Sequence, residues 1–246
     1  YLNALFPHVW AHFADIGDIG VVCVATGSFQ IEIVAVSADE VETVLVRENC
    51  SGDGTDPFAV WSGLSHECEG RLYLRLLALG DLTIHTLSWA TDVPPKHEPS
   101  LSIGLCTFNR EPELAATLSA IAHQRKRTPE IRSVYVVNQG PTFTNAAILG
   151  EISKPDVQMI EQPNLGGCGG FTRSMFETIS ADEQTTHHLL MDDDIVLDPR
   201  VLDKVLHFLR YADQKTAIGG QMLEVENPTL LYEAGGRLHP QLFATP

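Results

Sequence analysis

The first hundred residues alternate apolar and polar side chains. Between about Phe29 and Trp89 this period of two is typical of half-buried antiparallel strands. The segments that show it are 31–33, 41–44, 71–76 and 82–87. Turn-forming residues separate them, notably at 51–57 and 80–81. Several short strands at this spacing predict a jelly-roll-like β-sandwich or a small barrel over residues 1–97.

The pattern changes at a linker, residues 93–99, where three prolines in seven residues continue neither a helix nor a central strand. Beyond it, short apolar runs alternate with apolar residues at helical spacing. We expect strands at 101–106, 131–137, about 157–160, 187–191 and near 216–222, and helices through Leu114 and Leu118, over 170–179 and from Pro199. This alternation predicts an α/β domain with a mostly parallel sheet over residues 98–246. Ligands of such sheets bind outside the carboxyl ends of the strands.

Two of the predicted strand ends carry hydroxyl, amide and guanidinium groups. The first is followed by Thr107-Phe108-Asn109-Arg110, whose polar groups can hold a ring edge and a phosphate. The alternative is an ordinary helix N-terminal turn capped by Asn109. The second strand is followed by Asn138 in an Asn-Gln-Gly-Pro run, which suits either base recognition or a simple turn.

A third strand end is rich in glycine. Four glycines stand in residues 166–170, which we call the glycine run, shortly after Asn164 and before the predicted helix. At Gly166 and Gly167 bare backbone N–H groups and the positive end of a helix can approach a phosphate or a sugar. The run is neither the dinucleotide fingerprint nor a P-loop. A glycine loop without a ligand is the alternative.

The fourth strand end is the acidic triplet Asp192-Asp193-Asp194, which directly follows an apolar run. Three neighbouring carboxylates repel one another unless a cation offsets their charge. In an extended chain Asp192 and Asp194 point to the same side, so they predict a site for Mn²⁺ or Mg²⁺, with Asp193 facing elsewhere. The alternative is a solvated acidic turn before the helix at Pro199. We expect His187 and His188 to be structural.

Charge and composition limit the function. The 246 residues carry a formal charge of −16, which argues against a general binder of nucleic acid or anionic membranes. An anionic ligand would therefore need local positive potential from a metal ion, Arg110 and the glycine amides. No apolar run is long enough to span a bilayer, and no secretory signal is visible. Five scattered cysteines without CxxC spacing predict reduced thiols in a cytoplasmic protein.

In this order, the four motifs resemble the GT-A glycosyltransferase fold, in which a sugar nucleotide lies across the strand ends and a DxD-type motif holds a metal on its diphosphate. More narrowly, residues 107–110, 163–173, 191–195 and 219–223 look like the actinobacterial galactofuranosyltransferases that polymerise cell-wall galactan. Residues 1–7 and the β-rich segment after them are similar to the β-sandwich that precedes the catalytic domain in that family.

The resemblance implies roles for individual residues. Thr107 and Arg110 would contact uridine diphosphate, Asn164 would lie along the nucleotide sugar, and Asp192 would lie near the ribose and bind the metal together with Asp194. The other residues expected at the nucleotide-sugar site are Phe108, Asn109, Asn138, Gly166, Gly167 and Asp193. The reaction would be an inverting transfer of galactofuranose from UDP-galactofuranose to a hydroxyl of a lipid-linked galactan.

The same resemblance places the family's catalytic base, a metal-binding histidine and aromatic acceptor-site residues beyond Pro246. We therefore expect a GT-A domain truncated on its C-terminal side, with no catalytic residue assigned and no turnover by this chain alone. Glu233 is expected to line the acceptor site without acting as the base. A lipid-linked acceptor implies a cytoplasmic protein, peripheral at the inner face of the plasma membrane, and a homo-oligomer is left open.

Three other functions stay open from the sequence. A transferase of the same fold can use another sugar nucleotide. A non-catalytic carbohydrate-binding protein would use its β-sandwich for the glycan and its acidic triplet for Ca²⁺. A metal-dependent phosphatase or nucleotidyltransferase also uses clustered aspartates.

Overall fold

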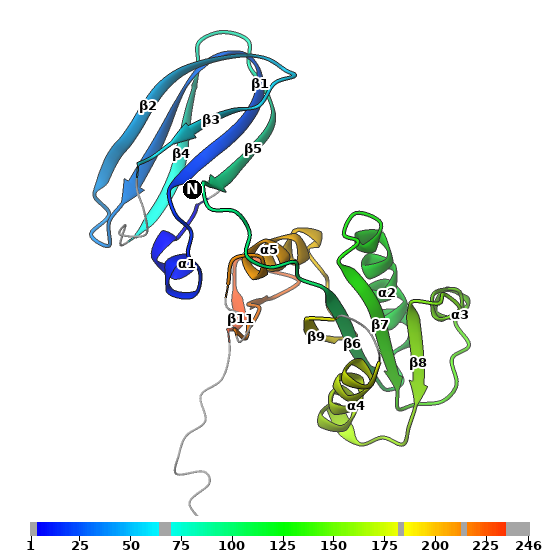
Figure 1. Cartoon of the computed structure of the whole chain (residues 1–246). Coiled ribbons are helices and arrows are strands. Elements are labelled where there is room, and N and C mark those ends of the chain that lie inside the picture. The colour runs from blue at the N-terminus through cyan, green and yellow to red at the C-terminus, as the bar shows by residue number, and fades with distance from the viewer. Residues whose placement is uncertain (1–3, 64–69, 182–184, 213–215, 235–246) are drawn as a thin grey trace, which may run out of the picture. The chain divides into compact units, whose positions relative to one another are not determined.

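The computed structural model of the chain describes residues 4–63, 70–181, 185–212 and 216–234 (Figure 1). The chain divides into two compact units. The first comprises Tyr1–Glu98 and His207–Gln214, and the second comprises Pro99–Leu206 and Lys215–Pro246. The domain boundary placed between residues 97 and 98 stays a prediction, and no pattern in the sequence indicated that residues 207–214 belong with the first unit.

The first unit is an antiparallel sheet organised around one long strand. Its elements are α1 (Pro7–Phe13), β1 (Ile19–Val36), β2 (Glu42–Asp53), β3 (Phe58–Trp61), β4 (Arg71–Ala78) and β5 (Thr83–Thr91). The first part of β1 pairs with β3 and β5, and its second part pairs with β2 and β4. The predicted antiparallel strands are therefore confirmed. They form one five-stranded sheet among the described residues, and the sandwich arrangement stays a prediction.

The core of the first unit explains why residues near 208 join it. Phe29, Ile31 and Ile33 are fully buried along β1. The ring of Phe208 lies 4.9 Å from the ring of Trp10, measured between centroids. The backbone N–H groups of residues 96 and 97 both donate to the carbonyl oxygen of residue 210. Aromatic packing and main-chain hydrogen bonds thus attach this late segment of the chain to the first unit.

The second unit is built on a four-stranded parallel sheet in the order β8-β7-β6-β9. Its elements are β6 (Leu101–Thr107), α2 (Glu111–Arg125), β7 (Ile131–Asn138), α3 (Ala146–Ile152), β8 (Val157–Glu161), α4 (Gly166–Ser180), β9 (His187–Asp192), α5 (Pro199–Leu209), β10 (Met222–Leu223) and β11 (Leu231–Glu233). The predicted α/β architecture is confirmed. Because all four strands run parallel, their carboxyl ends meet at one edge of the sheet.

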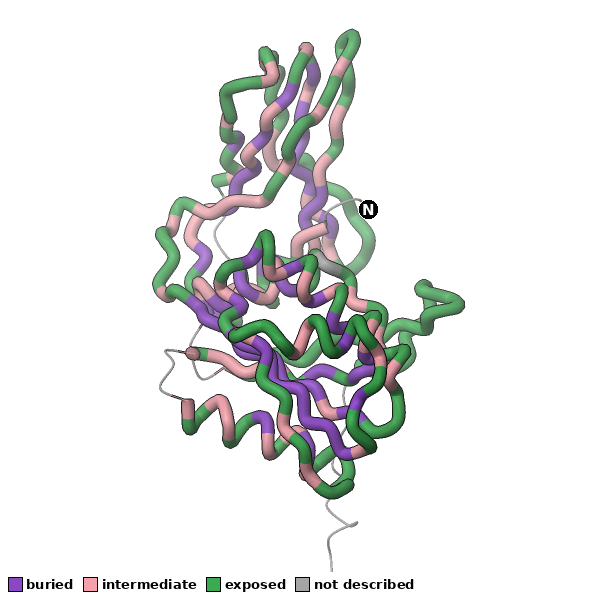
Figure 2. The backbone as a smooth tube through the Cα atoms, turned by 90° about the vertical axis from the view of Figure 1, so that its right-hand side faces the viewer, coloured by how far each residue is buried: buried purple, intermediate pink, exposed green. Residues whose placement is uncertain are grey.

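Alternation along β6 places helices on both faces of the sheet. Ile103 and Leu105 share a buried cluster with Leu114 and Leu118 of α2. On the opposite face, the hydroxyl of Ser102 lies 3.1 Å from that of Thr178 in α4. With both faces covered, β6 and β7 are almost continuously buried, and Figure 2 shows purple stretches of strand lying side by side in the lower part of the view.

Several local expectations need correction. The strand predicted near 216–222 is wrong, because only Met222–Leu223 pairs, with β11. Helices α1 and α3 and strand β3 were not predicted. Helix α4 begins at Gly166, four residues earlier than expected, so the glycine run forms its first turn. Within the described residues, no helix is long and apolar enough to cross a membrane.

Candidate functional site

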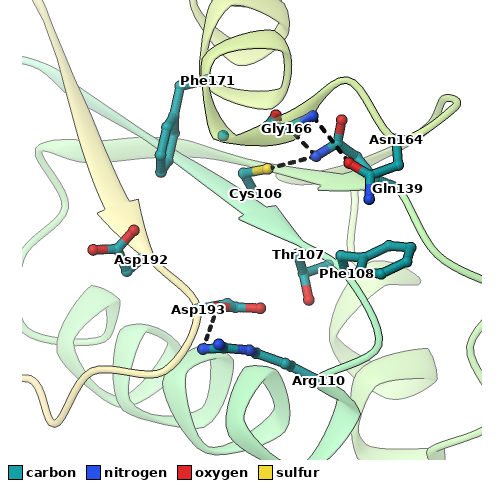
Figure 3. Close-up of a pocket in the computed structure, with 11 residues that line it drawn as sticks. Cys106, Thr107, Phe108, Arg110, Gln139, Asn164, Gly166, Phe171, Asp192 and Asp193 are labelled. Atoms are coloured by element: carbon teal, nitrogen blue, oxygen red, sulfur yellow. Dashed lines mark hydrogen bonds and ion pairs between the residues drawn. The ribbon is translucent and has the colours of Figure 1, made fainter.

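A pocket of about 260 Å³ lies at the carboxyl edge of the parallel sheet (Figure 3). Segments that follow all four strands contribute to its wall. The lining residues are Cys106, Thr107, Phe108, Arg110, Gln139, Asn164, Gly166, Gly167, Phe171, Asp192 and Asp193. Most of the residues expected from the sequence to bind a ligand therefore meet in one place, where ligands of parallel sheets bind.

Asn109 and Asn138 do not line the pocket. Asn138 is buried, and its side chain closes a turn by donating to the carbonyl oxygen of Pro141 at 2.8 Å and accepting from the backbone N–H of Gly140 at 3.0 Å. Asn109 has a φ of 57°, a left-handed conformation that asparagine tolerates better than most residues. A Cβ on Gly140 would lie 2.8 Å from Oδ1 of Asn109, so the two turns pack closely. Both asparagines shape the turns that follow β6 and β7.

The glycine run has two separate reasons for its composition. Gly166 and Gly167 line the pocket, and Gly166 has a φ of +69°, which favours glycine. Its N–H donates to Oδ1 of Asn164 at 2.9 Å. Further along, a Cβ on Gly170 would lie 2.1 Å from Sγ of Cys106, so only glycine lets α4 pack this closely on β6.

The acidic triplet does not continue as an extended strand. Strand β9 ends at Asp192, and the chain turns at Asp193 and Asp194. The hydroxyl of Thr117 in α2 holds this turn by donating to the carbonyl oxygen of Asp193 at 2.8 Å. The extended geometry expected for the triplet is therefore wrong, and Asp192 and Asp193 line the pocket whereas Asp194 does not. The metal site at Asp192 and Asp194 stays a prediction.

Asp194 forms an ion pair with Arg110, the residue before α2. Nη1 of Arg110 also lies 4.0 Å from Oδ1 of Asp193 (Figure 3). Asp193 is buried, and burial raises the pKa of its carboxyl group above the ordinary value for aspartate. The side chain of Thr107 lowers this pKa, the negative charge of Asp194 raises it, and the positive charge of Arg110 lowers it. The guanidinium of Arg110 at the pocket thus partly offsets the negative charge of the neighbouring Asp193 and Asp194.

The donor set at this edge fits a divalent metal ion in an open site. Among the residues that the structure describes, no three His, Cys, Asp or Glu side chains converge as a metal cage. Mg²⁺ and similar ions are commonly held by one or two carboxylates plus substrate phosphates, with water completing the shell. Oδ2 of Asp193 is buried without a hydrogen-bond partner among the described residues, and the guanidinium of Arg110 lies nearest the other oxygen, Oδ1, so Oδ2 is an acceptor that a cation could use.

A sequence model of the family described as "Glycosyltransferase like family 2" matches residues 99–242. The chain belongs to this family. The match covers the whole parallel sheet and every residue of the pocket. Family membership confirms the expected glycosyltransferase class, and the parallel sheet fits the expected GT-A fold.

Relatives of this family 2 chain extend the likeness into the first unit. The chain is 26% identical over 246 residues to "Galactofuranosyltransferase GlfT2" of Mycolicibacterium smegmatis, covering 96% of this chain and 37% of the relative. It is 26% identical over 254 residues to the GlfT2 of Mycobacterium tuberculosis, covering 99% of this chain and 39% of the relative. The resemblance to galactofuranosyltransferases is thereby confirmed. The chain spans less than two fifths of the length of these relatives.

Solved structures add no argument about the fold of this family 2 chain. The glycosyltransferase TibC from enterotoxigenic E. coli is 13% identical, with a TM-score of 0.20, over 62% of this chain and 35% of TibC. A likeness at this level is too weak to support a structural comparison.

Three lining residues of the family 2 site were not predicted. Cys106 lies on the face of β6 that alternation turns toward α4, as Ser102 and Gly104 do. Phe171 follows the glycine run directly, and its place in the first turns of α4 brings it to the pocket. Gln139 stands next to Asn138, and the exact end of β7 decides which of the two amides reaches the pocket. The described cysteines are all free, and Cys68 lies outside the described residues.

His188 has the structural role expected of it. Its Nδ1 lies 2.7 Å from the hydroxyl oxygen of Ser102, and its Nε2 lies 3.0 Å from that of Ser174. Burial lowers the pKa of the imidazole below its ordinary value. The ring therefore links β9, β6 and α4 beneath the pocket-forming segments as a neutral group.

Proposed function

We propose that this chain binds the donor of a glycosyltransferase that transfers galactofuranose from UDP-galactofuranose, with inversion, to a lipid-linked galactan. The observation that carries the proposal is the meeting of Thr107, Arg110, Asn164 and Asp192 in one pocket. These residues come from three of the motifs that resemble galactofuranosyltransferases, 107–110, 163–173 and 191–195, and they lie at or after the ends of β6, β8 and β9. Similarity to two proteins named as galactofuranosyltransferases supports the choice of sugar.

The pocket offers complementary groups for a uridine diphosphate. The guanidinium of Arg110 lines the pocket and has more N–H donors than its ion pair with Asp194 uses, so it can also donate to phosphate oxygens. Gly166 and Gly167 present backbone at the N-terminal end of α4, where the helix dipole favours an anion. The exposed ring of Phe108 offers an aromatic face to a base or a ribose.

A divalent ion, Mn²⁺ or Mg²⁺, completes the proposal. We assign it to Asp192 and Asp194, with Asp193 as a buried neighbour whose charge it would offset. When bound, such an ion stabilises the negative charge that develops on the leaving diphosphate. Because Asp194 is paired with Arg110, metal binding by this residue requires the pair to separate. We assign no catalytic base to the described residues.

The acceptor and location follow from the same proposal. A lipid-linked glycan would bring the protein to the inner face of the plasma membrane as a peripheral partner in the cytoplasm. The charge of −16 makes nucleic acid an unsuitable partner. Whether copies of the chain associate is a question for a measurement of mass in solution.

Calorimetry with the full chain tests the donor site. We expect UDP to bind only when Mn²⁺ or Mg²⁺ is present, and we expect Asp192→Asn and Asp194→Ala to weaken UDP binding by about tenfold or more, the loss of one charge-assisted contact. Glu113→Ala is a matched control, because Glu113 is an exposed acid at the start of α2 that does not line the pocket. UDP-galactofuranose should compete better than UDP-galactopyranose.

Other results would favour the other functions. Binding of a glycan without any binding of UDP would indicate a carbohydrate-binding protein. Metal-dependent release of phosphate from a simple ester, with indifference to the sugar on UDP, would indicate a phosphatase. Preference for UDP carrying a different sugar would keep the fold and site but replace the donor.

A further inference from the structure

Gln139 is buried at the end of β7, with 6% of its surface exposed, yet both ends of its side-chain amide are used. Nε2 donates to Sγ of Cys106 at 3.1 Å and to the carbonyl oxygen of Gly166 at 3.1 Å. Oε1 accepts from the backbone N–H of Leu165 at 2.8 Å and from Nε2 of Gln162 at 3.0 Å. One side chain therefore joins β6, β7, the segment after β8 and the start of α4.

These partners fix the orientation of the amide. The N–H of Leu165 can only donate and the carbonyl oxygen of Gly166 can only accept. Exchanging the oxygen and nitrogen of Gln139 would place donor against donor and acceptor against acceptor. The amide has two donor hydrogens and two main acceptor positions, and all four are occupied. Gln139 lines the pocket but has no hydrogen-bonding capacity left for a ligand.

Within the segment that Gln139 holds, the N–H of Gly166 donates to Oδ1 of Asn164, and the turn that follows has little stiffness of its own. Leu165 occupies the N-cap position of α4 and makes no side-chain capping bond. Glycines follow it, and glycine has the largest backbone freedom of any residue. The side-chain amide of Gln139 hydrogen-bonds to the backbone on both sides of this start, to the N–H of Leu165 and to the carbonyl oxygen of Gly166. The position of the first turn of α4 thus depends on a residue from a neighbouring strand.

We propose that Gln139 is a positioning residue for the diphosphate of the donor. It holds the glycine run so that the backbone of Gly167 at the start of α4 faces the phosphates, whereas the N–H and carbonyl groups of Gly166 are bonded to Asn164 and Gln139. Gln139 makes no hydrogen bond to the nucleotide itself. This inference rests on the proposed function, because it assigns the anionic part of a nucleoside diphosphate to the start of α4. It separates the role of Gln139 from any recognition of the base.

The test compares three variants by two measurements. Amide exchange by NMR reports the Leu165 N–H, and titration reports affinity for UDP and for uridine. In Gln139→Ala we expect Leu165 to exchange about tenfold faster, as for loss of one hydrogen bond, and UDP affinity to fall about tenfold, with uridine affinity unchanged. In Gln139→Glu the carboxylate still accepts from Leu165, so protection stays while UDP affinity falls, because the donor to Gly166 is lost and a negative charge is added.

Gln124→Ala is the matched control for loss of a buried glutamine. Gln124 is fully buried in the same unit and donates to Thr128 and Asp203 at 2.8 Å each, away from the pocket. We expect this variant to lose stability while keeping Leu165 protection and UDP affinity. An equal effect of Gln124→Ala on both readouts would show that general destabilisation explains the result and would overturn the proposal.

Two further outcomes would also overturn it. If Gln139→Ala weakens uridine as much as UDP, Gln139 contacts the nucleoside. If Leu165 exchange does not change, the side chain does not hold the start of α4. Failure of the wild-type chain to bind UDP would contradict the proposed function instead, and Leu165 exchange in Gln139→Ala and Gln139→Glu would still decide whether Gln139 holds the glycine run.

Discussion

The guanidinium of Arg110 pairs with the carboxylate of Asp194, joining the residue before α2 to the turn after β9. Arg110 lines the pocket and Asp194 does not. The group proposed to hold the diphosphate and a carboxylate proposed to hold the metal ion therefore neutralise each other. We expect a divalent cation and Arg110 to compete for the carboxylate of Asp194, so binding of metal and UDP should be linked through this exchange.

Arg110→Ala should therefore change the two affinities in opposite directions. In the absence of nucleotide, Mn²⁺ should bind roughly two- to fivefold more tightly, because an exposed ion pair is worth about 0.5–1 kcal/mol. With Mn²⁺ present, UDP should bind about tenfold more weakly or worse, because a charge-assisted hydrogen bond is lost. Calorimetric titrations with Mn²⁺ alone and with UDP measure both effects.

Arg200→Ala is the control for this experiment, since Arg200 forms an exposed ion pair with Asp198 in the same unit. It should leave both affinities unchanged. Unchanged or weaker Mn²⁺ binding by Arg110→Ala would show that the cation and the guanidinium do not compete.

Close packing of α4 on β6 gives a second prediction. A Cβ on Gly170 would lie 2.1 Å from Sγ of Cys106 and 2.9 Å from its Cβ, so Gly170→Ala must push the helix away from the strand. We expect a loss of about 1–3 kcal/mol in the free energy of unfolding, typical of overpacking, and weaker UDP binding because Gly166 and Gly167 move with the helix. Chemical denaturation and UDP titration measure the two effects.

Gly150→Ala is the matched control, because Gly150 lies in α3 with open space around it. It should stabilise the chain by about 0.5–1 kcal/mol, since alanine favours the helix. Adding Cys106→Ala to Gly170→Ala removes the shortest contact and should recover part of the lost stability. No recovery would show that the clash is not the cause.

The strand-end motifs were predictable because parallel strands share an edge. Once the apolar runs were assigned as parallel strands, Thr107, Arg110, Asn164 and Asp192 had to come together, although they are far apart in the chain. The positions of Asp193 and Asp194 were not predictable in this way. They depend on where β9 ends and on the bond from Thr117, which ties the turn to a helix on one face of the sheet.

The start of α4 shows a different limit. Glycine disfavours helix, so local propensity placed the helix start after the glycine run. Tertiary contacts outweigh that preference. Gln139 hydrogen-bonds to the backbone of Leu165 and Gly166, and Gly170 packs closely against Cys106. Helix α3 was missed because it is only seven residues long with Ile148 as its buried residue, too little for a helical period to show, although Asn145 caps it.

A buried acid in the first unit gives a third prediction. Glu32 on β1 is buried and accepts from Nε of Arg47 at 2.6 Å and from Nη1 of Arg75 at 2.8 Å. These two hydrogen bonds hold the pKa of Glu32 below its usual 4.5, and the bond from Arg47 has the larger effect. The ionised form therefore stabilises the fold above about that pH, and the contribution is lost as pH falls through the lowered pKa.

Glu32→Gln should accordingly lower the Tm of the first unit at pH 7 by more than the exposed neighbour variant Glu48→Gln. The difference between wild type and Glu32→Gln should shrink as pH falls below the usual 4.5 toward the lowered pKa of the folded state. Thermal unfolding followed across pH 7 to 3 measures it. A difference that stays constant over this range would mean that the ion pairs do not contribute the effect.

His188 gives the last prediction, in which stability is also lost as pH falls but in a higher pH range. The hydroxyl of Ser174 donates to the carbonyl oxygen of Phe171, so it accepts from His188, which places the proton of the neutral ring on Nε2. Burial lowers the pKa of this histidine below its usual 6.5. As pH falls through about 6.5, the unfolded chain therefore takes up a proton that the folded chain does not yet bind. The second unit loses stability from that pH down to the lower pKa of the folded state.

His188→Gln should separate the hydrogen bonds of the ring from the pH dependence that its titration gives to stability. At pH 7.5 it should cost about 1–2 kcal/mol, the worth of one or two hydrogen bonds, while its stability should change less than that of wild type between pH 7.5 and 5.5. His123→Gln, at an exposed position on α2, should keep the wild-type slope. Denaturant titrations at several pH values give the slopes, and equal slopes for wild type and His188→Gln would contradict the assignment of a half-buried neutral imidazole between α4 and the sheet.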